Sequence, residues 1–128
     1  MRLLLDNATF LFAALGDARL SDTAVRLIRD PENQVMLSVV SGWEIAVKHA
    51  RGKLDLPSPP DRFVPEVSDR MGLALLPLDM GPVLRAGRLP RLHDDPFDRM
   101  LVCQAIEHEL TILTPDEAVR QYPIPSAW

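Results

Sequence analysis

Apolar and polar positions along the chain form short blocks that predict alternating strands and helices. Short apolar runs are typical of buried parallel strands, and we expect strands at residues 2–5, 34–40, 73–76 and 111–113, with a short edge strand near Ile124. Capping residues and apolar stripes at helical spacing predict helices at residues 9–15, 21–28, 41–51, 61–71, 79–88 and 95–109, and a helical turn near Pro115. The alternation predicts an α/β fold, with helices flanking a central, mainly parallel sheet of four or five strands.

The composition fits one folded domain that comprises residues 1–128. Hydrophobic residues make up 47% of the 128 residues, which is enough to bury one core. No apolar stretch is long enough to cross a bilayer and no N-terminal leader is recognisable, so we expect a soluble, cytoplasmic protein without a membrane partner. Cys103 is the only cysteine, which excludes an intrachain disulfide and a cysteine metal cluster.

The formal net charge of −4 argues against a simple basic protein that binds nucleic acid by neutralising phosphates. It does not exclude a nuclease, because a divalent metal site is built from carboxylates. The ions bound there would supply positive charge where a phosphate approaches.

Acidic residues occur where the predicted strands end or the predicted helices begin. Asp6 directly follows the first strand, and Glu44 lies in the first turn of the helix after the second strand. Asp95 and Asp98 lie in the first turn of the long helix, and Asp116 follows the fourth strand by three residues. These ends share one edge of a parallel sheet, so acids that are distant in sequence are expected to converge there.

Local helix capping offers a competing explanation for most of these acids. Ser41 and Glu44 have the spacing of a capping box, in which the glutamate returns to the serine backbone. Asp95 precedes a proline at the first helical position and Asp98 follows it, which is the pattern of a capped helix start. Asp116 has the position of a cap for the last helical turn.

Asp6 has no evident capping role in this pattern. It emerges from an apolar strand and should be partly buried, and a buried charge needs a partner, for which the neighbouring Asn7 is available. Several carboxylates at one sheet edge would also repel one another unless a cation lies between them. Mg²⁺ or Mn²⁺ suits an all-carboxylate site of this kind.

The motifs around these acids occur in a fixed order along the chain. They are residues 3–6 (LLLD), 41–48 (SGWEIAVK), 52–57 (GKLDLP), 93–101 (HDDPFDRML) and 113–116 (LTPD). Together they resemble the PIN-domain toxins of the VapC type over essentially the whole chain. The second and fourth motifs are the most specific in combination.

The resemblance implies a three-layer PIN-like domain and a metal-dependent endoribonuclease that uses Mg²⁺ or Mn²⁺. Such proteins cut RNA, commonly in tRNA or rRNA loops, and leave 5′-phosphate and 3′-hydroxyl ends. They are toxins of toxin–antitoxin pairs, usually homodimers, and a VapB-like antitoxin silences them and makes the contacts to operator DNA. The family's catalytic and metal-binding quartet maps onto Asp6, Glu44, Asp98 and Asp116, and Asp95 is an additional acid.

Several polar residues near these motifs have both a structural and a functional interpretation. Lys48, Arg51 and Lys53 lie at the end of the Glu44 helix, where they either form a solvated face or contact RNA phosphates. Arg99 is suited to pair with a neighbouring acid or with RNA. For His93 the functional interpretation is contact with RNA or proton transfer, and we expect it to be an incidental loop residue.

The two positions after Asp6 depart from the family pattern. Asn7 replaces the usual threonine or serine and therefore lacks the hydroxyl. Its amide can still form hydrogen bonds, so Asn7 remains a candidate for contact with RNA. Ala8 argues against an aspartyl phosphatase, which needs a second aspartate there. The other alternative is a PIN-fold RNA-binding or scaffold module without catalysis or a toxin role.

Overall fold

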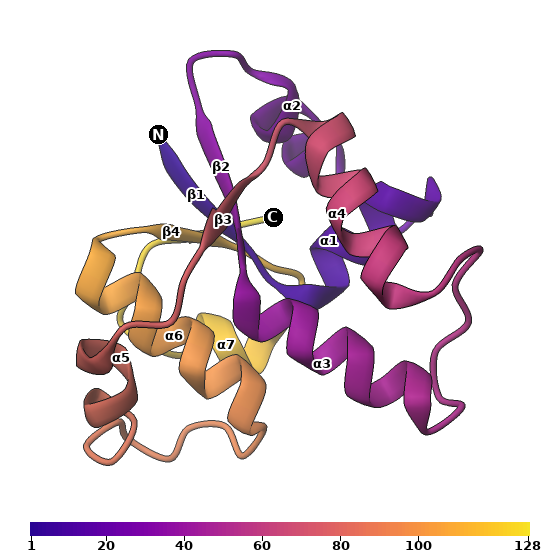
Figure 1. Ribbon diagram of the computed structural model, residues 1–128. Helices are drawn as coiled ribbons and strands as arrows, with labels where there is room; N and C mark the ends of the chain where they lie inside the picture. Colours follow the sequence, from indigo (N-terminus) through magenta and orange to yellow (C-terminus); the bar gives the residue numbers. More distant parts are fainter.

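A five-stranded sheet and seven helices make up the molecule, and the computed structural model describes all residues 1–128 (Figure 1). The strands are β1 (Arg2–Leu5), β2 (Gln34–Ser38), β3 (Ala74–Leu76), β4 (Thr111–Leu113) and β5 (Ser126–Ala127). The helices are α1 (Asn7–Leu15), α2 (Asp22–Arg29), α3 (Val39–Ala50), α4 (Pro60–Met71), α5 (Met80–Arg85), α6 (Pro96–His108) and α7 (Glu117–Arg120). No helix has the length and apolar character that spanning a membrane requires.

All strand pairs are parallel, in the order β3-β2-β1-β4-β5. The predicted parallel sheet is therefore confirmed, and it is fully parallel. The order in which strands are added to the sheet reverses between β1 and β4. From β1 the chain adds β2 and then β3 on one side, and β4 and β5 follow on the other side of β1. Ligand sites in open parallel sheets form beyond the carboxyl ends of the strands at this kind of reversal.

Side chains of the central strands alternate between two hydrophobic cores, one on each face of the sheet. Leu4 and Ile112 are fully buried in a core that α6 and α7 complete, whereas Leu3, Leu5 and Leu113 are fully buried in a core that α1, α3 and α4 complete. Burying one leucine side chain is worth about 2 kcal/mol. This double burial explains why the strands are continuous apolar runs.

The second strand and the third helix meet two residues earlier than expected. β2 ends at Ser38, whose side chain accepts a hydrogen bond from the Val40 backbone NH at 3.0 Å and caps α3. The same hydroxyl donates to Gln104 Oε1 on α6 at 2.6 Å. The predicted capping box is therefore wrong: Ser41 lies inside the helix, and its buried Oγ has no partner.

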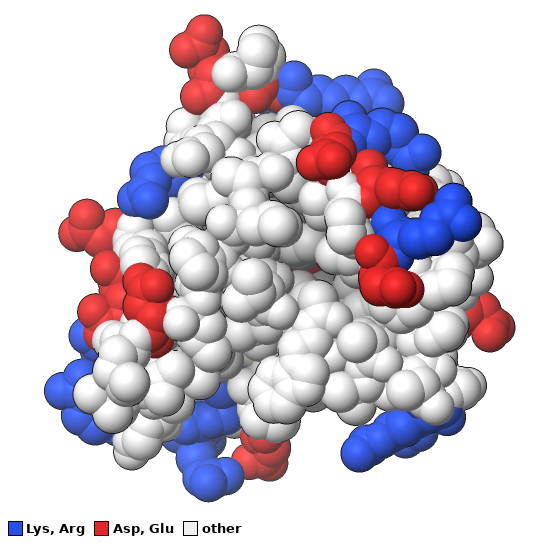
Figure 2. Space-filling view, in the orientation of Figure 1, with Lys and Arg blue, Asp and Glu red and all other residues white.

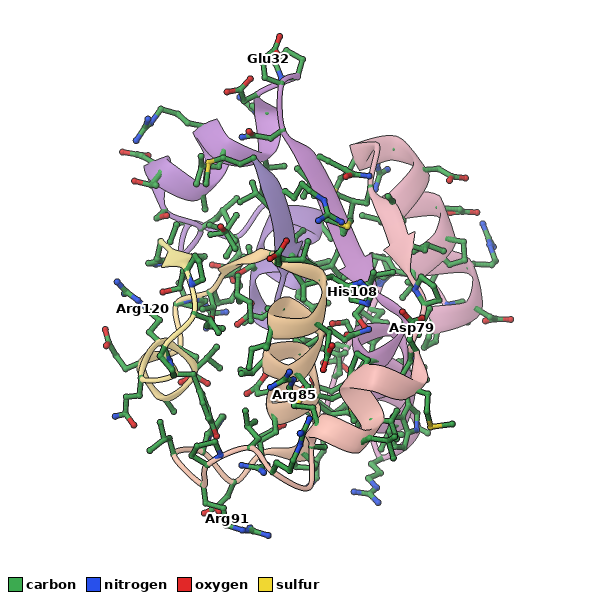
Figure 3. All side chains as sticks on the ribbon, turned by 90° about the vertical axis from the view of Figure 1, so that its left-hand side faces the viewer. Glu32, Asp79, Arg85, Arg91, His108 and Arg120 are labelled. Carbon is green, nitrogen blue, oxygen red and sulfur yellow. The ribbon has the colours of Figure 1, made fainter.

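Other boundaries shift by one to three residues. α1 begins at Asn7 and not at residue 9, α5 ends at Arg85 and not at residue 88, and the last strand is Ser126–Ala127 and not at Ile124. α5 is held against α6 by an Arg85–Glu107 ion pair of 2.7 Å and by an approach of 3.1 Å between Asp79 and His108. Asp79, Arg85 and His108 lie along the α5–α6 side (Figure 3).

Arg99 holds the connection between α5 and α6. Its guanidinium donates to the backbone carbonyls of Ala86, Leu89 and Pro90 at 3.0–3.2 Å and to the Tyr122 hydroxyl at 3.2 Å. The expected pairing with an acid is therefore wrong, whereas the expected contact with RNA phosphate stays a prediction. The planar guanidinium offers several donors in a fixed geometry, and the backbone carbonyls of this connection accept them in place of a carboxylate.

Replacing Arg99 should destabilise the protein. Arg99→Ala leaves several carbonyls of the connection without a donor, so we expect the free energy of unfolding to fall by about 2–3 kcal/mol in urea denaturation. Arg91→Ala is the matched control, because Arg91 is 79% exposed and extends into solvent (Figure 3). Equal stabilities of the two variants would contradict this role of Arg99.

Candidate active site

Asp6 leaves β1 at the reversal point of the sheet and caps α1. Its Oδ1 accepts a hydrogen bond from the Thr9 backbone NH at 2.8 Å, and the Thr114 hydroxyl, just after β4, donates to its Oδ2. The residue is only 3% exposed. The expectation that Asp6 has no capping role is wrong, and Thr9 and Thr114 are its partners in place of Asn7.

Glu44 lies in α3, past the first turn, and does not return to the helix start. It is 4% exposed, and one of its carboxylate oxygens pairs with Lys48 one turn later. The other oxygen, Oε1, is buried and has no hydrogen-bond partner. An unpaired buried carboxylate oxygen costs free energy, so this atom is available for a ligand in the cleft.

Asp95 and Asp98 lie at the start of α6, as expected. Asp95 caps the helix by accepting hydrogen bonds from the Phe97 and Asp98 backbone NH groups at 2.9 and 3.0 Å. The Asp98 carboxylate does not cap the helix, and its Oδ2 lies 2.9 Å from His93 Nε2.

Asp116 caps α7 with one oxygen and faces the cleft with the other. Its Oδ1 accepts a hydrogen bond from the Ala118 backbone NH at 2.9 Å, and its Oδ2 lies 3.6 Å from His93 Nε2. The capping role expected for this residue is therefore observed. The 38% exposure of its side chain leaves it more open to solvent than Asp98.

These residues line one open cleft of about 470 Å³, which we call the acidic cleft. Its acidic side consists of Asp6, Glu44, Asp95, Asp98 and Asp116. Its remaining wall consists of Asn7, Ala8, Leu11, Phe12, Leu15, Asp17, Arg19, Lys48, Lys53 and Leu54. The convergence expected from the sheet topology is thus present, and Lys48 and Lys53 also face the cleft. Arg51 and Arg99 do not line it.

The electrostatics of the acidic cleft disfavour bare carboxylates. Burial raises the pKa of Asp98 to about 6, and the charges of Asp95, Asp6 and Glu44 act in the same direction. Burial also raises the pKa of Asp6, although hydrogen bonds from Thr114 and Thr9 oppose the shift. Carboxylates in this state bind either protons or a cation.

The donor set fits a hard divalent cation. Such ions prefer carboxylate oxygens, and the cleft offers several from different elements at one place. The unpartnered Glu44 Oε1 fits such a site, because a bound cation would satisfy this buried oxygen. Lys48 neutralises only part of the negative charge of the cleft, because its one ion pair is with Glu44.

His93 is the functional candidate that the sequence undervalued. Its ring lies within hydrogen-bond distance of Asp98 and near Asp116, so it belongs to the acidic cluster and is not incidental. Burial lowers the pKa of the imidazole, but the hydrogen bond and charge of Asp98 outweigh it and raise the pKa above its usual value. Its place at the start of the HDDPFDRML motif, five residues before Asp98, was the signal in the sequence.

Comparison with known proteins places the chain in a family. The model of the PIN domain matches residues 4–125, and the chain belongs to the PIN-domain family. A segment of 53 residues is 38% identical to Ribonuclease VapC16 of Mycobacterium tuberculosis, covering 41% of this chain and 38% of the length of that relative.

Solved structures support the same fold. The structure of VapBC2 from Rickettsia felis bound to a fragment of promoter DNA has a TM-score of 0.72 at 14% identity, covering 100% of this chain and 99% of the other. DNA-bound VapBC from Salmonella typhimurium has a TM-score of 0.70 at 16% identity, with 99% and 97% covered. At these identities the likeness is one of fold.

The raised pKa of Asp98 predicts a pH-dependent stability of the metal-free protein. The folded state holds this proton more tightly than the unfolded chain, so stability falls as pH rises from about 4, near the ordinary pKa of 3.8, to about 6. The full loss corresponds to about 3 kcal/mol. With EDTA present, Asp98→Asn should therefore gain stability over wild type at pH 8, and the gain should shrink toward pH 4.

Urea denaturation at several pH values measures this gain. Asp94→Asn is the control, because the Asp94 side chain is 93% exposed and should show no such trend. A difference between Asp98→Asn and wild type that does not change with pH would contradict the prediction.

Proposed function

We propose that this protein is a divalent-metal-dependent endoribonuclease that uses Mg²⁺ or Mn²⁺. The observation that carries the proposal is the convergence of Asp6, Glu44, Asp98 and Asp116 on one cleft in which a buried Glu44 oxygen has no partner. The PIN-domain match and the partial identity to a ribonuclease support the same activity.

The four acids divide the work of holding the ion. Asp6 and Asp98 are the primary ligands, because burial raises the pKa of both carboxyl groups and a bound cation would offset that cost. Glu44 and Asp116 complete the ligand set directly or through water. An ion held there supplies positive charge against the phosphate and acidifies water, so the chemistry needs no other base.

Binding of the RNA backbone falls to the rest of the cleft. Lys48 and Lys53 lie on its wall and offer ammonium groups to phosphates that approach the acids. Asn7 lines the same cleft, and its amide, only 6% exposed as a residue, is positioned to hydrogen-bond the substrate next to Asp6. We therefore assign RNA contacts to these three residues ahead of Arg51 and Arg99.

We further propose that the chain is the toxin of a VapBC-type pair that acts in the cytoplasm. The support is its likeness to VapBC assemblies, two of which are described as bound to DNA. The partner would be a VapB-like antitoxin, and operator DNA would be contacted only through it. Loops of tRNA or rRNA are the proposed targets. Co-expression of the neighbouring gene product should relieve growth arrest caused by this chain.

Removing one primary ligand should abolish RNA cleavage. Asp98→Asn keeps the size of the side chain but removes its charge, so we expect cleavage of mixed RNA with Mn²⁺ to fall by at least about a hundredfold, a loss of about 3 kcal/mol of transition-state stabilisation. New 5′-phosphate ends mapped by sequencing measure the activity.

The matched control is Asp94→Asn, which removes a carboxylate from the same loop. Asp94 is almost fully exposed and does not line the acidic cleft, so its variant should cut at the wild-type rate. If wild type and Asp98→Asn behave alike in Mn²⁺, the chain is a PIN-fold RNA-binding or scaffold module and not a nuclease.

An exposed apolar face supports the expected homodimer. The α3–α5 face, as we call it, consists of the exposed side chains of Val39, Trp43, Leu75, Leu78, Met80, Val83, Leu84 and Leu92. The side of the molecule that carries β3 and α5 is broadly uncharged, with charged groups mostly at its rim (Figure 2). These side chains offer on the order of 800 Å², about what one partner contributes to a stable interface. A second copy of this chain is the occupant we propose, because two uncharged faces meet without charge conflict.

A charge in this face should separate the dimer. Leu84→Glu places a carboxylate on α5 at a side chain that is 66% exposed, so the fold should persist while the copies dissociate. Light scattering at micromolar concentration should give one chain per particle for the variant and two for wild type. Leu15→Glu, on α1 away from this face, should remain dimeric. A monomeric wild type would refute the dimer.

A further inference from the structure

His93 is held in a fixed position beside the acids. Its loop is anchored by Arg99, which donates to the carbonyls of Leu89 and Pro90 and approaches the carbonyl of His93 at 3.4 Å. Tyr122 also donates to the Pro90 carbonyl at 2.8 Å. The side chain of His93 is 21% exposed. The imidazole is therefore presented to Asp98 and Asp116 by a braced loop.

The ring nitrogen lies at the spacing of a metal ligand from two acids. His93 Nε2 is 2.9 Å from Asp98 Oδ2 and 3.6 Å from Asp116 Oδ2, and the three atoms all lie within 4.8 Å of one another. An octahedral ion with bonds of about 2.1 Å separates adjacent ligand atoms by about 3 Å and opposite ones by about 4 Å. One ion can therefore contact all three atoms after small shifts.

Two further observations point to a ligand at this place. Glu44 Oε1, buried in the same cleft, has no partner in the protein. Asp116 is anchored through Oδ1 to the start of α7, so its Oδ2 is left for the cleft. The fold thus holds Glu44 and Asp116 with a carboxylate oxygen left over on each, and His93 Nε2 lies near the Asp116 oxygen.

We propose that His93 is a nitrogen ligand of the divalent ion in the acidic cleft and makes the site prefer Mn²⁺ to Mg²⁺. Imidazole nitrogen binds transition-metal ions well, whereas Mg²⁺ prefers oxygen ligands and water. The inference rests on the metal site of the proposed function, but it concerns the identity of the ion and not the cleavage of RNA.

A competing role would leave His93 outside the metal's ligands. A protonated imidazole between Asp98 and Asp116 would neutralise them only while no ion is bound, and it would withdraw when an ion enters. In that case removing His93 would leave Mn²⁺ affinity unchanged or raise it, because the ion would no longer displace a positive charge. The two roles are therefore distinguished by one substitution, because only the ligand role predicts weaker Mn²⁺ binding.

Binding of Mn²⁺ to the intact protein, followed by electron paramagnetic resonance, tests the proposal without RNA. His93→Ala should weaken Mn²⁺ binding by at least about tenfold, as loss of an ordering metal contact does. Mg²⁺ affinity, measured by competition against Mn²⁺, should change less, so the preference for Mn²⁺ over Mg²⁺ should fall. His49→Ala is the matched control, because His49 lies near the end of α3 and is not part of the His93, Asp98 and Asp116 group.

Pulsed resonance detects the bond itself. Wild type loaded with Mn²⁺ should show coupling to an imidazole nitrogen that changes when histidine is labelled with ¹⁵N and disappears in His93→Ala. Thermal unfolding in EDTA verifies that the variant is folded. Absence of nitrogen coupling in wild type, or unchanged Mn²⁺ affinity in a folded His93→Ala protein, overturns the proposal. A protein that binds Mn²⁺ through His93 but does not cut RNA would refute only the nuclease activity.

Discussion

Repulsion between carboxylates at one sheet edge is the constraint on which the site depends. The parallel sheet brings the ends of β1 and β4 together at the reversal point, so acids placed after these strands cannot avoid one another. Burial makes the conflict worse, as the raised pKa of Asp98 shows. The fold answers with local partners, namely the Thr9 and Thr114 groups on Asp6, Lys48 on Glu44 and His93 on Asp98. These partners leave the cluster short of positive charge, which is the property a cation site needs.

The sequence predicted the sheet because the strands are buried on both faces and leave a simple apolar signature. It failed where that signature continues into a helix: Val39 and Val40 extend the apolar run of β2, yet they begin α3. Only the Ser38 hydroxyl marks the change, and serine at the end of a strand is not decisive by itself. The start of α1 was missed for a different reason, because Asn7 and Ala8 carry no apolar periodicity.

The places of the acids followed from topology, whereas the contacts of the longer side chains did not. An acid at a strand end has little freedom, so its approach to the sheet edge is fixed by the backbone. Arg99 and His93 depend on the path of the loop after α5, which no local pattern specifies. Arg99 was expected to meet an acid or RNA, but it meets the carbonyls of that loop. The same loop brings His93 back to Asp98.

Capping and metal binding were treated as competing explanations for these acids, and the structure makes them compatible. Asp116 uses Oδ1 to cap α7 and turns Oδ2 toward His93, and Asp6 accepts from Thr9 on Oδ1 and from Thr114 on Oδ2. A carboxylate has about four sites at which it accepts, so one helix cap does not exhaust it. The cap instead fixes the orientation of the remaining lone pairs, which reduces the entropy lost when an ion binds. Helix capping therefore supports the role of Asp6 in the proposed site, because the cap fixes the orientation of its carboxylate.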